Sequence, residues 1–399
     1  MYEPKATSWT SVVVNEFVSL QLVATSPILD WFVSISYDDF DSSLSSAAKA
    51  FLSEPISFFT SRLPTVTATA VAAYLSWVVF QACLYVFVPG PLHQAPRTPG
   101  GRRLLYRLNG FSAWAVTVAL AAYASYAGFV DPAVIAKHWT TTIATAMVYS
   151  FALIGIFYIK ARVVPDNKGD TLLTGHFWYD LFNGGELHPR TGQLFDWKHF
   201  NASRTGGILA WTLIFFETLD GAHERFSFYN IFGFAVMMPH LWTLQTQYLA
   251  THPVRLSTPA VVLVVIGFAV GWTINHIANE QKAASRRTNG KFRIGGQEAK
   301  TVEAKYHTAD GKTHRTILLC SGLWGIVRHP NYVGSITYAW ASCLPCGSGH
   351  LLPYLEAILV TGICIHRCFR DEARCKAKYG EAWAEYCQHV KSRLIPGVF

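Results

Sequence analysis

The chain has 399 residues, of which 51% are hydrophobic and only 15% are charged, against about 25% charged residues in an ordinary globular protein. This composition excludes a disordered chain, a coiled coil and a small disulfide scaffold, and it favours a polytopic membrane protein over a soluble enzyme. The net charge is +8. The basic residues lie between and after the apolar runs, as in cytoplasmic loops beside an anionic membrane. No basic stretch resembles a nucleic-acid-binding module, so no nucleic acid partner is expected.

Apolar runs divide the chain into three predicted regions. Residues 1–65 are expected to form a polar, partly amphipathic extension. Runs of roughly 20 apolar residues, enough to cross the hydrocarbon core, follow at 66–88, 111–131, 140–159, 227–249 and 259–278. Two shorter hydrophobic segments, 333–347 and 351–366, are expected to form a tight membrane hairpin. The sequence therefore predicts an all-α, multi-pass transmembrane bundle, with an extension over 1–65, an N-terminal bundle over 66–249 and a C-terminal region over 250–399.

The loop charges conflict with a simple count of crossings. The basic loop at 97–107 is predicted to be cytoplasmic by the positive-inside rule. If every apolar run crosses, the segment 281–316 then lies in the lumen, although it is rich in Lys and Arg. The conflict disappears if the short run 206–219 does not cross, or if one crossing is missing between residues 219 and 227.

The cysteines favour reduced thiols over a metal site. Seven of the eight follow residue 319, and Cys343 and Cys346 form a lone C-x-x-C pair. A structural zinc site needs a second ligand pair at suitable spacing, and none is evident. We therefore expect no metal and no disulfide framework.

Three stretches carry the residues most suited to chemistry. The segment 173–200 holds Asp, Glu, His and Arg among aromatics, either as a functional site or as an ordered interfacial loop. Lys282 and Arg286 are four residues apart, share a helix face and suit a phosphate, although anchoring charges at a helix end are a common alternative. Between 321 and 387, charged and aromatic groups flank the predicted hairpin. They indicate a pocket where a charged cofactor meets a lipid-dissolved substrate.

Specific motifs then identify a resemblance. They are T-H-P-V-R-L-S-T-P at 251–259, Y-H-T-A-D-G-K-T-H at 306–314, G-H-L-L-P-Y at 349–354 and H-R-C-F-R-D-E-A-R-C at 366–375. The chain resembles the membrane sterol reductase family, which includes delta-7, delta-14 and delta-24(28) sterol reductases and the lamin B receptor. The similarity extends from about residue 173 to residue 399, is weaker before it, and is strongest to the delta-7 branch.

This resemblance implies an NADPH-dependent reduction of a sterol double bond in the endoplasmic reticulum membrane, with a delta-7 bond as the first choice. A sterol and membrane lipid are the implied partners. By the family pattern, Lys282 and Arg286 hold the NADPH phosphates. The other implied pocket residues are Leu319, Trp324, Asn331, Tyr332, Arg367, Asp371, Cys375, Lys376, Ala377, Lys378, Tyr379 and Tyr386.

The implied reaction needs an acid in an apolar place. An isolated alkene accepts hydride poorly, so it is first protonated to a tertiary carbocation, from which water must be excluded. An apolar cavity keeps a carboxyl group protonated. Asp371 is the first candidate for an acid or proton-relay residue, with binding of the nicotinamide or ribose as an equal alternative, and Tyr332 is a second donor candidate. Glu217 and Glu356 are intramembrane acids that match no family motif.

The chain departs from the family after residue 219. Family members carry roughly one further crossing here, followed by an acidic, aromatic stretch that helps to form the sterol pocket. This chain has only D-G-A-H-E-R-F at 220–226. Either an exon has been lost from the gene model, which we expect, or the protein is a shortened paralogue with weak or absent activity.

Alternatives from other classes stay open at this point. A membrane methyltransferase of the isoprenylcysteine type shares the R-H-P-x-Y element found at 328–332. The segment 173–200 and the Lys282/Arg286 pair favour the reductase, because the methyl donor has no phosphates. A scaffold like the lamin B receptor is disfavoured because residues 1–65 are not basic. A delta-14 or delta-24(28) reductase and an inactive sterol-binding paralogue also remain.

Overall fold

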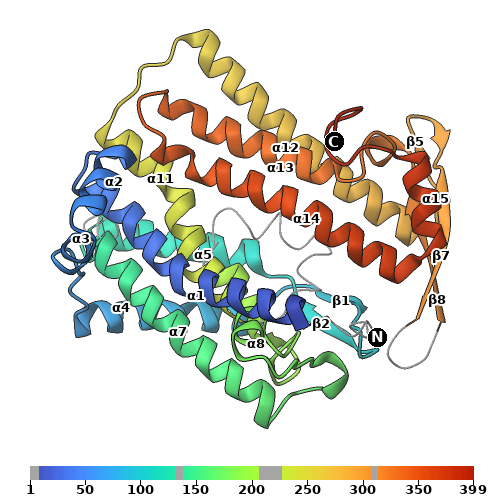
Figure 1. Cartoon of the computed structure of the whole chain (residues 1–399), viewed down its shortest axis with the longest axis horizontal. Helices are drawn as coiled ribbons and strands as arrows, with labels where there is room; N and C mark the ends of the chain where they lie inside the picture. Colours follow the sequence, from blue (N-terminus) through green and yellow to red (C-terminus); the bar gives the residue numbers. More distant parts are fainter. Residues whose placement is uncertain (1–8, 132–137, 206–226, 308–312) are drawn as a thin grey trace. The chain divides into compact units, whose positions relative to one another are not determined.

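The computed structural model describes residues 9–131, 138–205, 227–307 and 313–399. The chain divides into two compact units, with the boundary between Thr243 and Leu244. Within the described residues both units are mainly helical (Figure 1). The predictions for the run 206–219, for Glu217 and for the short connection 220–226 lie outside the described residues.

Membrane-spanning helices occur in both units. Among the described residues, five helices are long and apolar enough to cross a membrane. The helices that contain them are α1 (Trp9–Asp38), α4 (Ala68–Phe87), α7 (Trp139–Val163), α12 (Thr258–Arg287) and α14 (Leu355–Tyr379). The predicted multi-pass membrane protein is therefore confirmed.

The first of these helices corrects the prediction of a polar extension over 1–65. Helix α1 holds an apolar span, Val12–Asp38, although Glu16 and Asp30 interrupt its sequence. Its charges find partners inside the unit. The carboxylate of Asp30 is 4% exposed and lies 2.7 Å from Nδ1 of His240, so it is hidden from lipid. The short helices α2 (Leu44–Ser53) and α3 (Pro55–Thr60) follow.

The rest of the N-terminal unit packs around α7. Helix α5 (Gly110–Tyr126) lies in the run predicted to cross at 111–131, but with 17 residues it is not among the five helices that are long and apolar enough to span. The run predicted at 227–249 becomes a consecutive series of helical segments: α10 (Phe228–Phe232), the π-helical η5 (Gly233–Met237) and α11 (Met238–Thr251). Apolar residues of α7, α10 and η5 form one core cluster, which includes Ile154, Phe157, Phe228, Phe232 and Val236.

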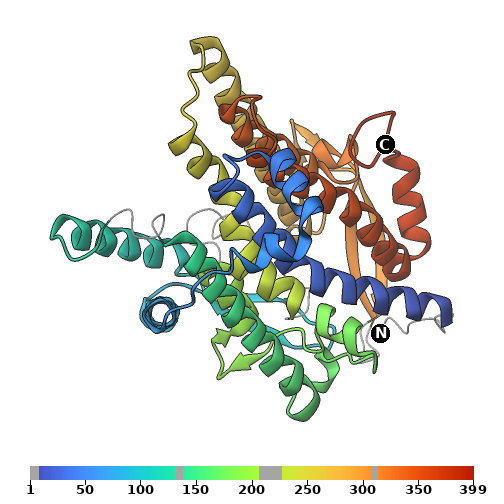
Figure 2. The same ribbon diagram turned by 60° about the vertical axis from the view of Figure 1, so that its left-hand side comes forward.

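The C-terminal unit is built on three helices that lie side by side. Figures 1 and 2 both show α12, α13 (Pro330–Cys343) and α14 running alongside one another. Helices α12 and α13 approach closely at two glycines. A Cβ on Gly334 would lie 2.5 Å from the backbone nitrogen of Asn275, and one on Gly271 would lie 2.5 Å from that of Tyr338. Small residues at such crossings let membrane helices pack backbone to backbone.

Four two-stranded antiparallel hairpins modify the all-α prediction within the described residues. They are β1 (Leu92–Arg97) with β2 (Arg103–Arg107), β3 (Arg190–Thr191) with β4 (Phe195–Asp196), β5 (Arg293–Ile294) with β6 (Gln297–Glu298), and β7 (Thr301–His307) with β8 (Thr313–Leu319). Hairpin β7–β8 falls in the segment that the sequence predicts as a basic loop. Its T-V-E-A-K-Y-H alternation buries Val302 and Ala304 on one face.

Candidate functional site

The predicted phosphate-binding pair lies at the end of α12. Lys282 and Arg286 are one turn apart there, and Nζ of Lys282 lies 4.6 Å from the centroid of the Trp324 ring. Trp324 belongs to the 3-10 helix η6 (Gly322–Gly325), and its indole N–H donates to the backbone oxygen of Ala278 at 2.7 Å. The end of α12 and the loop that follows β8 are thereby fixed together.

One face of α14 supplies the opposite side of the site. Asp371, Cys375 and Tyr379 are spaced by four residues and share that face. The Cys375 thiol lies within electrostatic range of Lys282, Arg286, Lys378 and Asp371. Cationic side chains from α12 and α14 therefore converge around one thiol.

The other residues of the predicted run 375–379 divide between the faces of α14. Nζ of Lys378 lies 4.1 Å from the centroid of the Tyr306 ring, which belongs to β7. The rings of Tyr306 and Tyr379 lie 6.2 Å apart. Successive helical residues are about 100° apart, so Lys376 and Ala377 project away from the face that holds Cys375, and both are exposed.

A direct hydrogen bond joins the two residues proposed for proton transfer. The hydroxyl of Tyr332, on α13, donates to Oδ2 of Asp371 at 2.6 Å. The ring of Tyr332 is buried and stacks on His329, with centroids 5.1 Å apart. Oδ1 of Asp371 faces Nε of Arg370 at 3.5 Å and a guanidinium nitrogen of Arg374 at 3.8 Å.

The structure assigns packing roles to two further predicted pocket residues. Leu319 is buried at the end of β8, in a cluster with Ala278 and Trp324. Tyr386, on α15 (Glu381–His389), stacks on Trp383 at 5.0 Å in a cluster that also contacts Cys375 and Tyr379. Burial raises the pKa of the Tyr386 hydroxyl.

Asn331 and Arg367 complete the predicted set. Asn331 begins α13, and its backbone oxygen accepts a hydrogen bond from Nδ2 of Asn275 at 2.9 Å. Its side-chain oxygen Oδ1 is buried and has no hydrogen-bond partner among the described residues. Arg367 lies one turn before Asp371 on the same face of α14.

The R-H-P-N-Y element has two separate roles. Nε of Arg328 donates to Oε1 of Glu372 at 2.8 Å, and its NH1 donates to the backbone oxygens of Val390 and Lys391 at 3.0 and 2.8 Å. Arg328 therefore holds the segment that follows α15, whereas the hydroxyl of Tyr332, from the same element, is hydrogen-bonded to Asp371. Sequence reasoning missed Glu372 and Tyr306. The period-2 alternation of β7 was the available signal for Tyr306.

The site fits a phosphorylated dinucleotide. Lys282, Arg286 and Lys378 provide cationic donors for phosphate oxygens. The rings of Tyr306 and Trp324 hold Lys378 and Lys282 in place, and Oδ1 of Asn331 is a buried acceptor left for a polar cofactor group. A methyl donor without phosphates offers no phosphate oxygen to these three cations.

The segment 173–200 forms a structural network in the N-terminal unit. Asp196 is fully buried and accepts hydrogen bonds from the hydroxyl of Tyr106 at 2.8 Å and from the backbone N–H of His199 at 2.9 Å. Burial alone opposes ionisation, but the hydrogen bond with His188 and the charge of Lys198 lower the pKa of Asp196. Burial lowers the pKa of His199 to about 3.

Two further acidic residues of this segment also have local partners. Oε2 of Glu186 pairs with Nζ of Lys160 at 2.8 Å, and Oδ2 of Asp180 pairs with a guanidinium nitrogen of Arg162 at 3.0 Å. These contacts fit the ordered-loop alternative for the segment.

Glu356 lies outside the site. It is 4% exposed at the start of α14, where Oε2 accepts a hydrogen bond from Nε2 of Gln245 at 2.6 Å. Asp371 follows 15 positions later on the same helix, and a rise of 1.5 Å per residue separates the two by roughly 22 Å.

Comparison with known proteins assigns a family to this arrangement. The model of the ergosterol biosynthesis ERG4/ERG24 family matches residues 40–217 and 214–399. The two matched segments meet close to the place where one crossing is expected to be missing. A Xenopus laevis protein named 7-dehydrocholesterol reductase is 35% identical, over 95% of this chain and 91% of its own length.

Two further relatives show the breadth of the similarity. An Arabidopsis thaliana protein of the same name is 29% identical, over 98% of this chain and 99% of its own length. A Dictyostelium discoideum protein named Delta(14)-sterol reductase is 31% identical, over 88% of this chain and 82% of its own length. The alignment with the Xenopus laevis relative spans 435 residues, more than the 399 of this chain.

Proposed function

Because the chain belongs to the ergosterol biosynthesis ERG4/ERG24 family of sterol reductases, we propose that it reduces the delta-7 double bond of a sterol with NADPH in the endoplasmic reticulum membrane. The observation that carries this proposal is the convergence of Lys282, Arg286 and Lys378 on Cys375, beside the hydrogen-bonded pair of Tyr332 and Asp371. This arrangement combines anion binding with a proton path on one unit.

Cofactor binding rests on three cationic side chains. Lys282 and Arg286 from α12 and Lys378 from α14 hold phosphate oxygens by charge-assisted hydrogen bonds. Lys378 packs on the ring face of Tyr306, and Lys282 packs on the ring face of Trp324. These cations are therefore positioned before a ligand binds. NADPH supplies the hydride when bound.

The pair of Tyr332 and Asp371 moves the proton. The hydroxyl of Tyr332 directs its proton toward Oδ2 of Asp371, whose other oxygen faces Arg370 and Arg374. Tyr332 delivers that proton to the alkene carbon, and Asp371, partly exposed, returns one to the phenol oxygen from solvent. This order makes Tyr332 the donor and Asp371 its relay partner.

The surroundings of Tyr332 protect a cation from water. Its ring packs with Cys364, Cys368 and Leu394, and Phe399 lies against the same cluster. An apolar wall of this kind lets a tertiary carbocation persist until hydride reaches it.

The choice of the delta-7 bond is supported by the names of the relatives. The Xenopus laevis and Arabidopsis thaliana proteins are named 7-dehydrocholesterol reductase. The Dictyostelium discoideum protein, named Delta(14)-sterol reductase, is less similar to this chain than the Xenopus laevis protein is, at 31% against 35% identity, so reduction of a delta-14 bond is the second candidate.

The test is expression in a yeast strain that lacks its own sterol reductases, with feeding of defined sterols and gas chromatography of the products. We expect a fed delta-7 sterol to lose that double bond. Loss of only a delta-14 or side-chain double bond would instead assign the protein to another reductase activity of the same family. Binding of S-adenosylmethionine without binding of NADPH would replace the reductase by a methyltransferase.

A further inference from the structure

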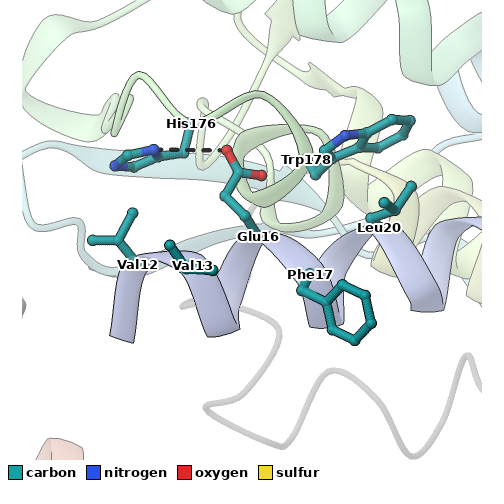
Figure 3. A pocket seen from close by; sticks show the side chains of 7 residues that line it. All are labelled: Val12, Val13, Glu16, Phe17, Leu20, His176 and Trp178. Carbon is teal, nitrogen blue, oxygen red and sulfur yellow. Dashed lines mark ion pairs between the residues drawn. The ribbon is translucent and has the colours of Figure 1, made fainter. Parts of the chain in front are cut away.

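A shallow groove of about 410 Å³ lies between the start of α1 and helix α8 (Phe177–Asn183) in the N-terminal unit (Figure 3). Its α1 wall is a stripe of apolar residues at helical spacing, Val13, Phe17 and Leu20. Val13 is 47% exposed and Phe17 is 57% exposed. The apolar span of α1 begins at Val12, so the groove lies at the N-terminal end of this span.

A carboxylate and an imidazole face each other in this groove. Oε1 of Glu16 and Nδ1 of His176 lie 3.6 Å apart, which is longer than a direct N–H···O hydrogen bond of about 2.9 Å. Oε2 of Glu16 accepts the backbone N–H of Tyr179 at 3.0 Å, so the carboxylate is held in place. Both side chains are partly exposed.

The pair matches a hydroxyl group. A hydroxyl donates one hydrogen bond and accepts others, so its oxygen can bridge the acceptor Glu16 and the donor His176 from the open side of the groove. A phosphate headgroup is repelled by the carboxylate. The groove therefore suits an amphiphile whose polar end is a single hydroxyl.

The two ends of the groove differ in polarity, as the two ends of such an amphiphile do. Figure 3 shows His176 above Val12 and Trp178 near Leu20, further along α1. The polar end thus lies toward the start of α1, and the indole lies further along the apolar span. A sterol in a bilayer is arranged in this way, with its hydroxyl at headgroup depth and its rigid ring system in the hydrocarbon.

We propose that the α1–α8 groove binds a sterol with a free hydroxyl from the bilayer, through Glu16 and His176 at its polar end and Phe17 and Trp178 along its body. The choice of a sterol among hydroxylated lipids rests on the proposed function. The groove belongs to the unit that precedes residue 244, whereas the cofactor site belongs to the unit that follows it.

The experiment uses the full chain in phosphatidylcholine vesicles that contain a photoreactive sterol with a free hydroxyl. Cross-linked peptides are then mapped by mass spectrometry. We expect labelling of α1 between residues 12 and 20 and of the residues near Trp178. Glu16→Ala is expected to lower that labelling about tenfold or more, the loss expected when a hydrogen bond to a charged group is removed.

Controls separate binding from folding. Phe17→Trp fills the groove without touching Glu16 and is also expected to lower labelling, whereas Asn15→Ala, on an exposed neighbouring position of α1, is expected to leave it unchanged. Excess unlabelled sterol is expected to compete, and the same sterol esterified at its hydroxyl is not.

Three results would overturn the inference. The first is labelling of Glu16→Ala and Phe17→Trp at the level of the unmodified chain, and the second is equal competition by the ester. The third is labelling of the same residues by a photoreactive phospholipid, with the same dependence on Glu16. The outcome is independent of catalysis. If the groove is labelled but the protein reduces no sterol, the groove inference stands and the proposed function fails. If the protein reduces sterol but the groove is not labelled, the proposed function stands and the groove inference fails.

Discussion

The side chains around Cys375 carry the proposed cofactor chemistry, and they come from three elements. Arg286 extends from α12, Lys378 from α14 and Tyr306 from β7. The spacing of Lys282 and Arg286 predicted their shared face. No local pattern indicated that Tyr306 lies under Lys378, because that contact depends on how the β7–β8 hairpin packs against α14.

A single arginine tests the phosphate contact. Arg286→Ala is expected to weaken NADPH binding about tenfold or more, because it removes a charge-assisted hydrogen bond. The neighbouring Arg287→Ala is the matched control. Arg287 is exposed and faces Glu280 at 3.4 Å, so its loss is expected to leave the dissociation constant unchanged. Titration of purified protein with NADPH measures both, and equal effects would remove Arg286 from the site.

The proton relay gives a separate prediction. Tyr332→Phe is expected to lower kcat about a hundredfold or more, since a positioned proton donor contributes a factor of this order. Its dissociation constant for NADPH is expected to stay within a few-fold. Asp371→Asn is expected to lower kcat as well, with a smaller loss of cofactor affinity than Arg286→Ala. If Asp371→Asn abolishes NADPH binding instead, Asp371 is a cofactor ligand and not a relay residue.

At the scale of elements, α12 and α13 depend on close approach at Gly334. Gly334→Ala is expected to destabilise the protein by about 1–3 kcal/mol, because the added Cβ would lie 2.5 Å from the backbone nitrogen of Asn275. Gly362→Ala on α14 is the control, since a Cβ there meets nothing within 4 Å. Thermal unfolding in detergent compares them, and an equal melting temperature for both variants would refute the close-packing argument.

The buried network of segment 173–200 makes stability depend on pH. The pKa of His199 is lowered by burial to about 3, against about 6.5 in an unfolded chain. The unfolded chain therefore binds a proton that the folded chain does not, so stability is fully present above about pH 6.5 and falls as pH drops toward 3, by about 1.4 kcal/mol per pH unit. The lowered pKa of Asp196 adds a loss only below about pH 4, where the unfolded carboxyl becomes protonated.

The measurement is the melting temperature at pH 7 and pH 5. We expect a drop for the unmodified chain and a smaller drop for His199→Asn, whose baseline at pH 7 is lower because the 2.6 Å contact with the Tyr85 hydroxyl is lost. His389→Asn, at an exposed position of α15, is expected to keep the full drop. Identical pH dependence in His199→Asn would contradict this assignment.

Among the elements, apolar runs predicted the positions of α4, α7 and α12, because a run of roughly 20 apolar residues is long enough to cross the hydrocarbon core as a helix. The apolar span of helix α1 was not predicted, because Glu16 and Asp30 made its sequence look polar. Their partners, His176 and His240, lie more than a hundred residues away. Such distant pairing does not show in any local pattern of the sequence.

For the whole molecule, the feature to test is the length of chain between residues 205 and 230. Loop charge and the two matched family segments that meet at 214–217 both point to this place. Amplification of the transcript across these codons is expected to give a product longer than the 399-residue sequence requires. A product of only that length would mean that the protein is a shortened paralogue. In that case, inserting the corresponding segment of the Xenopus laevis relative is expected to raise reductase activity.

The central claim is that the unit following residue 243 holds an NADPH site, and equilibrium binding tests it most directly. Purified full-length protein in detergent is titrated with NADPH, NADH and S-adenosylmethionine, with alkylation of Cys375 measured by mass spectrometry. We predict saturable NADPH binding that protects Cys375, together with weaker binding of NADH and no protection by S-adenosylmethionine. Protection of Cys375 by S-adenosylmethionine, with none by NADPH, would contradict this claim.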